Sequence, residues 1–202
     1  VRHLKKYFHT PAGLLHAVDD VNFSIPKGKT MGVVGESGCG KSTLGRSLLC
    51  LEPPTAGEIL FEGKNIAALS KREMKKVRPK IQMVFQDPYS SLNGRMTVRQ
   101  LIAEPLLVNK ICKNRAEVDQ KVDEMMETVG LAKRLDMAYP HELDGGRRQR
   151  IGIARALILN PEFVVCDEAV SALDVSVRAQ VLNLMRNMQQ KKNKTKRRGM
   201  EL

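Results

Sequence analysis

The sequence predicts an α/β protein whose sheet carries a phosphate-binding loop, and three observations support this fold class. Residues 31–34 are an apolar run that leads into the segment 35–42, Gly-Glu-Ser-Gly-Cys-Gly-Lys-Ser, and a helix-prone segment begins at Lys41. Residues 163–166 form a second apolar run, typical of a strand buried on both faces. Helix start signals recur between the two runs. We therefore expect helices inserted between strands of one sheet.

Length and composition bound the class of protein. The chain has 202 residues, of which 42% are hydrophobic and 28% charged, as in an ordinary soluble globular protein with one substantial core. No apolar run is long enough to span a bilayer, and the N-terminus has no signal-peptide pattern. The four cysteines are scattered without C-x-x-C spacing, so the sequence suggests neither a zinc site nor a disulfide framework. We therefore expect the protein to lie in a reducing cytoplasm.

The net charge of +12 raises the question of nucleic-acid binding. Residues 191–202 carry six of the basic residues and one acidic residue. A charge run at a terminus is usually solvated, so we expect these residues to be a disordered or non-native basic tail. Aromatic residues make up 4% and Trp is absent, so the stacking platforms of a single-strand binder are not evident.

The elements expected before the helical region are mainly strands. Residues 18–25 alternate apolar and polar side chains and end at a Pro-Lys-Gly turn, after which residues 31–34 form the strand entering the loop. Residues 58–61 and 81–85 are predicted as further strands. Between them Ser70 and Glu73 form a capping box that starts a short basic helix.

The helical subdomain is predicted over about residues 86–160. Thr97 with Gln100, and Asn114 with Glu117, provide helix start signals. The second helix has one apolar face and is stopped by Gly130. The residues on that face are Val118, Val122, Met125, Met126 and Val129.

The loop at residues 35–42 has the spacing of a phosphate cradle. Its backbone N–H groups and the following helix N-terminus attract anions, Lys41 reaches the β- and γ-phosphates, and Ser42 offers a hydroxyl to Mg²⁺. The alternative is a glycine-rich turn that happens to hold a lysine. The predicted nucleotide-binding residues of this region are Gly35, Ser37, Gly38, Cys39, Gly40, Lys41, Ser42 and Thr43.

Two acids follow the second apolar run. Asp167 is predicted to bind Mg²⁺ and Glu168 to polarise the attacking water as the catalytic base, as a phosphate-loop ATPase requires. Alone, the pair would be solvent-facing acids that cap a strand end. The phosphate loop upstream favours the catalytic interpretation.

The order of these motifs resembles the ATP-binding subunits of ABC transporters, and more closely those of bacterial oligopeptide and dipeptide importers. Residues 33–46 are similar to the phosphate loop of that subfamily and residues 86–93, Gln-Asp-Pro-Tyr-Ser-Ser-Leu-Asn, to its glutamine loop. The match runs from residue 1 to about residue 190. It implies an ABC-type nucleotide-binding domain over 1–190: a P-loop NTPase core with an N-terminal antiparallel β-subdomain and an inserted helical subdomain.

The resemblance assigns further roles. Gln86 is implied as a catalytic residue that senses Mg²⁺ and the attacking water. Phe8, with Tyr7 as runner-up, occupies the place of the ring that stacks on adenine, the alternative being local packing on an edge strand. Residues 171–174 resemble a loop that crosses the dimer interface; without this context they would be an N-cap for a helix from Val175.

The family signature Leu-Ser-Gly-Gly-Gln is replaced here by Leu-Asp-Gly-Gly-Arg at residues 143–147. In the family this helix start, including the positions of Gly145 and Gly146, binds the γ-phosphate held by the other subunit. Asp144 is as good a helix N-cap as Ser, but its charge repels a phosphate. Arg147 offsets part of that charge.

Three other positions depart from the family pattern. Ala169 and Gly94 stand where proline is usual. The family also places a switch histidine one strand after the dimer-crossing loop, whereas all four histidines here precede Glu168. We therefore expect a C-terminal truncation or frame change near residue 190, and poor hydrolysis of bound ATP. The four histidines are His3, His9, His16 and His141.

Together these features predict an ATP- and Mg²⁺-binding ATPase subunit that powers peptide import. Its expected partners are a second ATP-binding subunit, identical or related, integral-membrane transporter subunits and, indirectly, a solute-binding protein. Its expected location is the cytoplasmic face of the cell membrane, as a peripheral subunit. The alternatives are a non-transport ABC ATPase that acts on nucleic acid or ribosomes, and an inactive truncated gene product.

Overall fold

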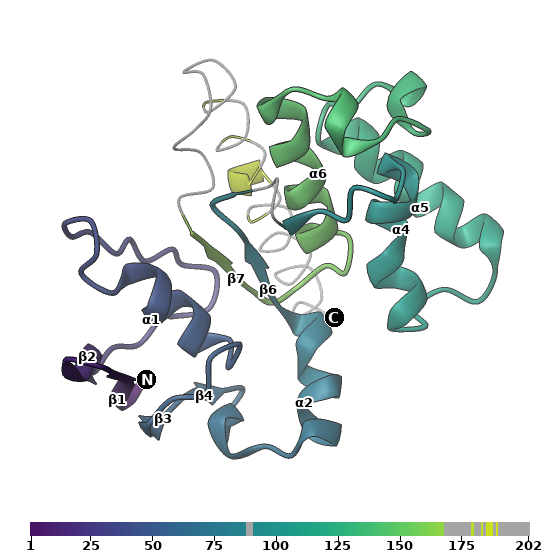
Figure 1. The fold of residues 1–202 in the computed structure, drawn as a ribbon. Coiled ribbons are helices and arrows are strands. Elements are labelled where there is room, and N and C mark those ends of the chain that lie inside the picture. Colours follow the sequence, from purple (N-terminus) through teal and green to yellow (C-terminus); the bar gives the residue numbers. More distant parts are fainter. Residues whose placement is uncertain (88–90, 168–178, 180–182, 184, 188, 190–202) are drawn as a thin grey trace. The chain divides into compact units, whose positions relative to one another are not determined.

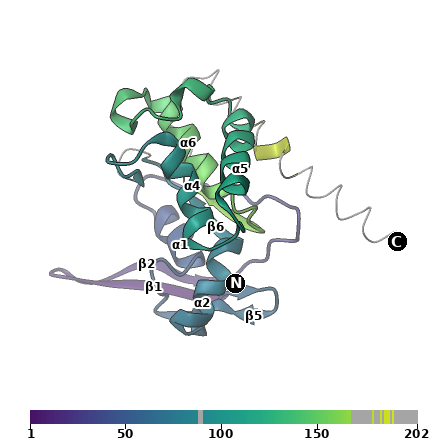
Figure 2. The same ribbon diagram turned by 90° about the vertical axis from the view of Figure 1, so that its right-hand side faces the viewer.

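The computed structural model describes residues 1–87, 91–167, 179, 183, 185–187 and 189. It divides into two compact units, residues 1–78 and 79–202 (Figures 1 and 2). The first unit is mainly antiparallel sheet with short helices. The second contains a parallel strand pair and a helical layer. The predicted basic tail at 191–202 lies outside the described residues.

The first unit is built on an antiparallel sheet of order β2-β1-β3. Its strands are β1 (Arg2–Thr10), β2 (Gly13–Val21) and β3 (Ala56–Glu58), and Figure 2 shows β1 and β2 side by side as a long hairpin. Backbone hydrogen bonds between Val1 and Phe23 extend the β1–β2 pairing beyond the strand ends. The sheet carries Leu4 and Val18 into the core of this unit.

The remaining elements of the first unit are short. Helix α1 (Lys41–Leu48) is followed by the hairpin β4 (Leu60–Phe61) and β5 (Lys64–Asn65), the 3₁₀ turn η1 (Ile66–Ala68) and helix α2 (Lys71–Val77). The predicted capping box of α2 is confirmed: the Ser70 hydroxyl accepts from the Glu73 amide, and the Glu73 carboxylate accepts from the Ser70 amide at 3.0 Å. The 3₁₀ turn η2 (Arg78–Lys80) follows α2.

Among the described residues of the second unit, two parallel strands form a sheet. Strand β6 (Ile81–Val84) pairs with β7 (Phe163–Cys166), and the register places Ile81 opposite Phe163. The pairing continues on both sides, because Glu162 donates to the Lys80 carbonyl at 2.7 Å and Asp167 to the Val84 carbonyl at 3.0 Å. Residues that follow the two strands therefore lie at the same edge.

The helices α4 (Val98–Val108), α5 (Arg115–Thr128) and α6 (Gly145–Leu157) pack together, α4 contacting both others and α6 contacting β6 (Figure 1). The 3₁₀ turns η3 (Lys133–Leu135) and η4 (Pro140–Glu142) connect α5 to α6. The predicted N-caps of α4 and α5 are confirmed, as is the stop at Gly130, whose φ is +69°. On the predicted apolar face of α5, Met125 is only partly buried, and the other predicted residues belong to the hydrophobic core.

Several predictions need correction. Residues 31–34 form no strand among the described residues, and Met31, Val33 and Val34 are exposed there. An apolar run becomes a strand only where a neighbouring backbone supplies hydrogen bonds, which the sequence pattern does not report. Residues 163–166 are a strand, but half-buried with Cys166 exposed. The strand expected at 18–25 ends at Val21, and 58–61 divides between β3 and β4.

Candidate functional site

The loop at residues 35–42 wraps around the ammonium group of Lys41. Lys41 Nζ donates to the carbonyl oxygens of Gly35 at 2.8 Å and Glu36 at 2.6 Å, and it lies 3.8 Å from Cys39 Sγ. The cation is thus held inside the turn by carbonyl oxygens of the loop itself. An incoming phosphate would exchange these contacts for a stronger charge-assisted one.

Glycine is required at two points of this loop. Gly38 has φ +81° and Gly40 has φ +92°, which are left-handed values that other residues rarely adopt. A Cβ added to Gly40 would lie 2.1 Å from the Ala17 carbonyl oxygen, so the backbone of β2 leaves no room for a side chain. Gly40 is also the N-cap of α1 and contributes no side-chain oxygen to the helix start. The amides of the first helical turn are therefore suited to a phosphate.

Helix α1 is anchored at its other end. The Arg78 guanidinium donates to the carbonyls of Leu49 at 2.6 Å and Cys50 at 3.0 Å, just after the last helical turn. A cation there satisfies terminal carbonyl groups and complements the helix dipole. Ser42 and Thr43 lie in the first turn of α1, so their hydroxyls are carried on an element fixed at both ends.

In the second unit, the β6–β7 pairing brings two predicted residues to one edge. Asp167 follows β7 directly and is only 8% exposed, while the exposed Gln86 follows β6 by two residues. A carboxylate and an amide at the carboxyl ends of adjacent parallel strands are oxygen donors of the kind Mg²⁺ takes. No group of three or more His, Cys, Asp or Glu side chains within the described ranges could hold a metal. Mg²⁺ sites commonly use one or two carboxylates with substrate phosphates, so these residues fit the ion.

The two candidate aromatic rings differ in their surroundings. The Tyr7 ring stacks on His16 with centroids 3.9 Å apart, and its hydroxyl donates to Asp19. That hydrogen bond raises the pKa of Tyr7 to about 12. Phe8, the next residue of β1, has the Lys6 ammonium 4.8 Å from its ring centroid. Adjacent strand residues point to opposite faces, so the rings serve different surfaces of the hairpin.

The signature segment forms the start of α6. The Asp144 carboxylate accepts from the Arg147 amide at 2.8 Å, which confirms it as the N-cap, and Arg147 Nε lies 3.4 Å from its second oxygen. Both side chains are substantially exposed. Gly145 and Gly146 occupy the first helical turn, and a Cβ on Gly145 would meet nothing within 4 Å.

The predicted site residues thus fall into two groups. The loop residues and Phe8 lie in the first unit, and Gln86, Asp167 and the signature glycines lie in the second. The catalytic base predicted at Glu168, together with Ala169 and residues 171–174, lies outside the described residues.

Gln149 was not among the residues predicted from the sequence. This side chain is 3% exposed on α6, and its Nε2 lies 3.5 Å from the Phe85 carbonyl oxygen. The signal was present in the helical pattern, because Gln149 shares the apolar face of α6 with Ile153 and Ala156. A polar residue on such a face indicates a buried partner.

These features can be compared with known proteins. The profile of the ABC transporter family matches residues 18–171. The chain belongs to the ABC transporter family. It is 54% identical over 196 residues to the oligopeptide transport ATP-binding protein OppF of Bacillus subtilis. The aligned region covers 96% of this chain and 64% of that protein. It is 52% identical over 185 residues to the dipeptide transport ATP-binding protein DppF of Lactococcus lactis subsp. cremoris, covering 91% of this chain and 59% of that protein.

Solved ABC structures share the fold. The dimeric post-hydrolysis state of the ATP-binding cassette MJ0796 bound to ADP and Pi superposes with a TM-score of 0.86 at 28% identity, covering 95% of this chain and 82% of that chain. The predicted P-loop NTPase core, N-terminal antiparallel β-subdomain and inserted helical subdomain are confirmed by this likeness. The chain spans about six tenths of the length of the curated relatives it matches. None of the helices among the described residues has the length and apolar character to cross a bilayer.

Proposed function

We propose that this chain is the ATP-binding, ATP-hydrolysing subunit of a peptide importer. The observation that carries the proposal is the loop around Lys41, whose left-handed glycines and ammonium group, hydrogen-bonded to two loop carbonyls, suit a phosphate. Relatives that cover almost the whole chain are oligopeptide and dipeptide transport ATP-binding proteins, which supports peptides as the transported solute.

In the proposed reaction the loop amides and Lys41 hold the β- and γ-phosphates, and Phe8 stacks on the adenine. The residues that would hold Mg²⁺ are Ser42 of the first unit and Asp167 and Gln86 of the second, each through a side-chain oxygen atom. When bound there, Mg²⁺ would supply positive charge to balance the charge that builds up on the phosphate oxygens. Glu168 orients and deprotonates the attacking water, and Gln86 positions that water. Gly145 and Gly146 of a second ATP-binding subunit, identical or related, complete the anion site, in keeping with the dimeric cassette MJ0796.

Asp144 makes this chain different from the family pattern. Its exposed carboxylate stands at a helix start that would face a phosphate, and Arg147 at 3.4 Å balances only part of the charge. We therefore propose that hydrolysis is slowed by this side chain while ATP binding at the loop is retained.

Binding of a fluorescent ATP analogue to the chain tests the assignment of the loop. Lys41→Ala should weaken the affinity at least ~10-fold, because a phosphate loses its charge-assisted donor. The matched control is Lys71→Ala, an exposed lysine in the same unit, which should leave the affinity unchanged. Equal affinities for the Lys41→Ala and unsubstituted chains would contradict the proposal.

Membrane association and peptide import need a separate test. We expect the chain to co-sediment with membranes when integral-membrane subunits of a peptide importer are co-expressed, at the cytoplasmic face. It should restore uptake of a labelled peptide in cells that lack their own importer ATPase. Association with membranes devoid of those subunits, or restored growth on a sugar alone, would contradict this assignment.

A further inference from the structure

Helix α6 contacts both described ends of the segment that carries Gln86. At the near end, Gln149 Nε2 lies 3.5 Å from the Phe85 carbonyl oxygen, one residue before Gln86. At the far end, Arg155 Nη1 donates to the Ser91 carbonyl oxygen at 2.9 Å. Both donors come from a single helix.

The two contacts differ in strength and complement each other. The Gln149 contact is long, but the side chain is 3% exposed, so losing its partner would leave a buried amide unsatisfied. The Arg155 contact is charge-assisted, and its second nitrogen, Nη2, pairs with Glu104 of α4 at 3.0 Å. Arg155 is thus held on α4 while it holds the backbone at Ser91.

The core fixes the flanks of the same segment. Val84, at the end of β6, is 1% exposed, and Leu92, next to Ser91, is 7% exposed. Both belong to the apolar cluster that contains Ile151 and Ala154 of α6. Gln86 itself is exposed. The described residues on either side of it are held by α6 through both apolar packing and polar contacts.

We propose that Gln149 and Arg155 are positioning residues that set the place of Gln86 relative to Asp167, and that they join this segment to the helix that begins at Asp144. The inference rests on the proposed function of Gln86 in hydrolysis. A displacement of about 1 Å in a catalytic group can cost up to ~100-fold in rate, so such contacts matter to turnover beyond their worth in stability.

Arg150 provides a matched control on the same helix. Its Nη1 donates to the carbonyls of Val129 at 3.0 Å and Gly130 at 3.2 Å, so it too links α6 to a backbone segment. That segment is the end of α5 and carries no predicted catalytic residue. Arg155→Gln and Arg150→Gln therefore remove comparable arginines, and only the first acts near Gln86.

The experiment is single-turnover release of labelled phosphate from ATP by the full chain, with ATP affinity measured in parallel. We expect Arg155→Gln and Gln149→Leu each to reduce the rate constant ~10-fold while the affinity stays within about twofold, because the loop around Lys41 is untouched. Arg155→Lys, which keeps one charged donor, should recover part of the rate. Arg150→Gln should leave the rate constant unchanged.

Equal rate constants for Arg155→Gln and Arg150→Gln, or for Arg155→Gln and the unsubstituted chain, would overturn the positioning role. The variant Gln86→Ala distinguishes a failure of the positioning role from a failure of the proposed function. If it lowers the rate while both positioning variants do not, only the positioning role is wrong. If it leaves the rate unchanged, the role of Gln86 is wrong and the positioning role falls with it. If Arg155→Gln is insoluble, the rate constant of Gln149→Leu is compared with that of Arg150→Gln, and equal values would overturn the positioning role.

Discussion

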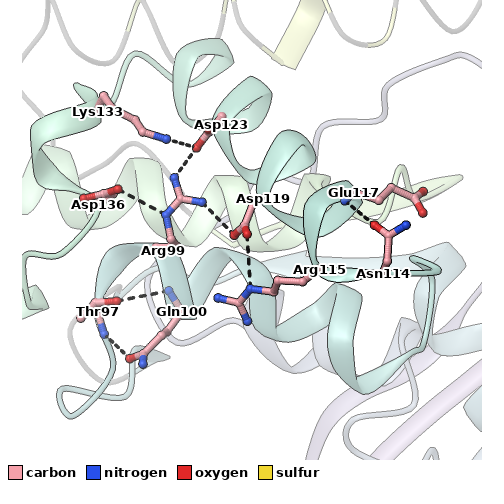
Figure 3. Close-up of polar contacts among 10 residues, drawn as sticks. All are labelled: Thr97, Arg99, Gln100, Asn114, Arg115, Glu117, Asp119, Asp123, Lys133 and Asp136. Carbon is pink, nitrogen blue, oxygen red and sulfur yellow. Dashed lines mark hydrogen bonds and ion pairs between the residues drawn. The ribbon is translucent and has the colours of Figure 1, made fainter.

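Arg99 and Asp136 are joined twice, by backbone and by side chain. The Arg99 amide donates to the Asp136 carbonyl oxygen at 2.9 Å, and Arg99 Nε lies 3.3 Å from Asp136 Oδ2. The same guanidinium contacts Asp119 and Asp123 of α5, and Lys133 also contacts Asp123 (Figure 3). One arginine, with a side chain 14% exposed, thus connects the start of α4 to α5 and to the turn after η3.

Removing this arginine should destabilise the helical layer. Arg99→Met leaves three partly buried carboxylates close together without their shared cation, and we expect the free energy of unfolding to fall by about 2 kcal/mol in urea titration. The control is Arg115→Met, whose side chain is 65% exposed and pairs with Asp119 at 3.4 Å. An exposed pair of this kind contributes below ~1 kcal/mol, so equal losses for the two variants would contradict the central role of Arg99.

The cluster also predicts how stability depends on pH. Hydrogen bonds from Lys133 and then Arg99 lower the pKa of Asp123 below its ordinary value of 3.8. A group with a lowered folded-state pKa stabilises the fold fully above its unfolded-state pKa, and the contribution is lost as pH falls through the folded-state pKa. Asp123→Asn should therefore flatten the loss of stability below about pH 4. Parallel acid-unfolding curves for the variant and the unsubstituted chain would show this to be wrong.

Two glycines of the phosphate loop should respond differently to alanine. Both have positive φ, which costs about 1 kcal/mol for a residue with a Cβ. Only at Gly40 does that Cβ also approach a backbone oxygen, that of Ala17, at 2.1 Å. We expect Gly40→Ala to lower the melting temperature more than Gly38→Ala and to abolish binding of the ATP analogue. Equal melting temperatures would mean that the contact with β2 does not restrict the loop.

Much of the second unit could be predicted from sequence because its determinants are local. Thr97, Asn114 and Asp144 each accept a hydrogen bond from an amide three residues ahead, and such caps are visible in the sequence. The apolar run at 31–34 gave a wrong prediction because a strand depends on a distant partner. The helical pattern places Gln149 on the apolar face of α6, but its partner at Phe85 is remote in the chain and could not be predicted.

The charge at the signature helix can be restored to the family pattern. Asp144→Ser combined with Arg147→Gln keeps an equivalent N-cap and removes a carboxylate whose repulsion of a phosphate is worth about 2–4 kcal/mol at an effective dielectric near ~20. We expect faster steady-state phosphate release at unchanged melting temperature. Arg147→Gln alone should slow release further, because it removes the cation 3.4 Å from Asp144. An unchanged rate of phosphate release in the double variant would contradict the proposal that Asp144 slows hydrolysis.

The aromatic assignment can be decided by two substitutions on β1. Phe8→Ala should weaken binding of the ATP analogue, since base–aromatic stacking contributes about 1–3 kcal/mol. Tyr7→Phe removes only the hydroxyl that donates to Asp19 and should leave the affinity unchanged. The two affinities are measured by the same fluorescence titration, and an unchanged affinity of Phe8→Ala would contradict the assignment.

The pairing of β6 with β7 has a consequence for biosynthesis. Ile81 meets Phe163 only after α4, α5 and α6 have been translated, whereas α4 contacts α5 and α6 over shorter spans of chain. Contacts between distant segments form slowly because the loop must first be closed. A nascent chain whose residues up to 157 have left the ribosome would already hold its helical layer but would lack the edge where Gln86 and Asp167 lie. Nascent chains of increasing length should therefore gain protease resistance in the helices before β6 becomes protected.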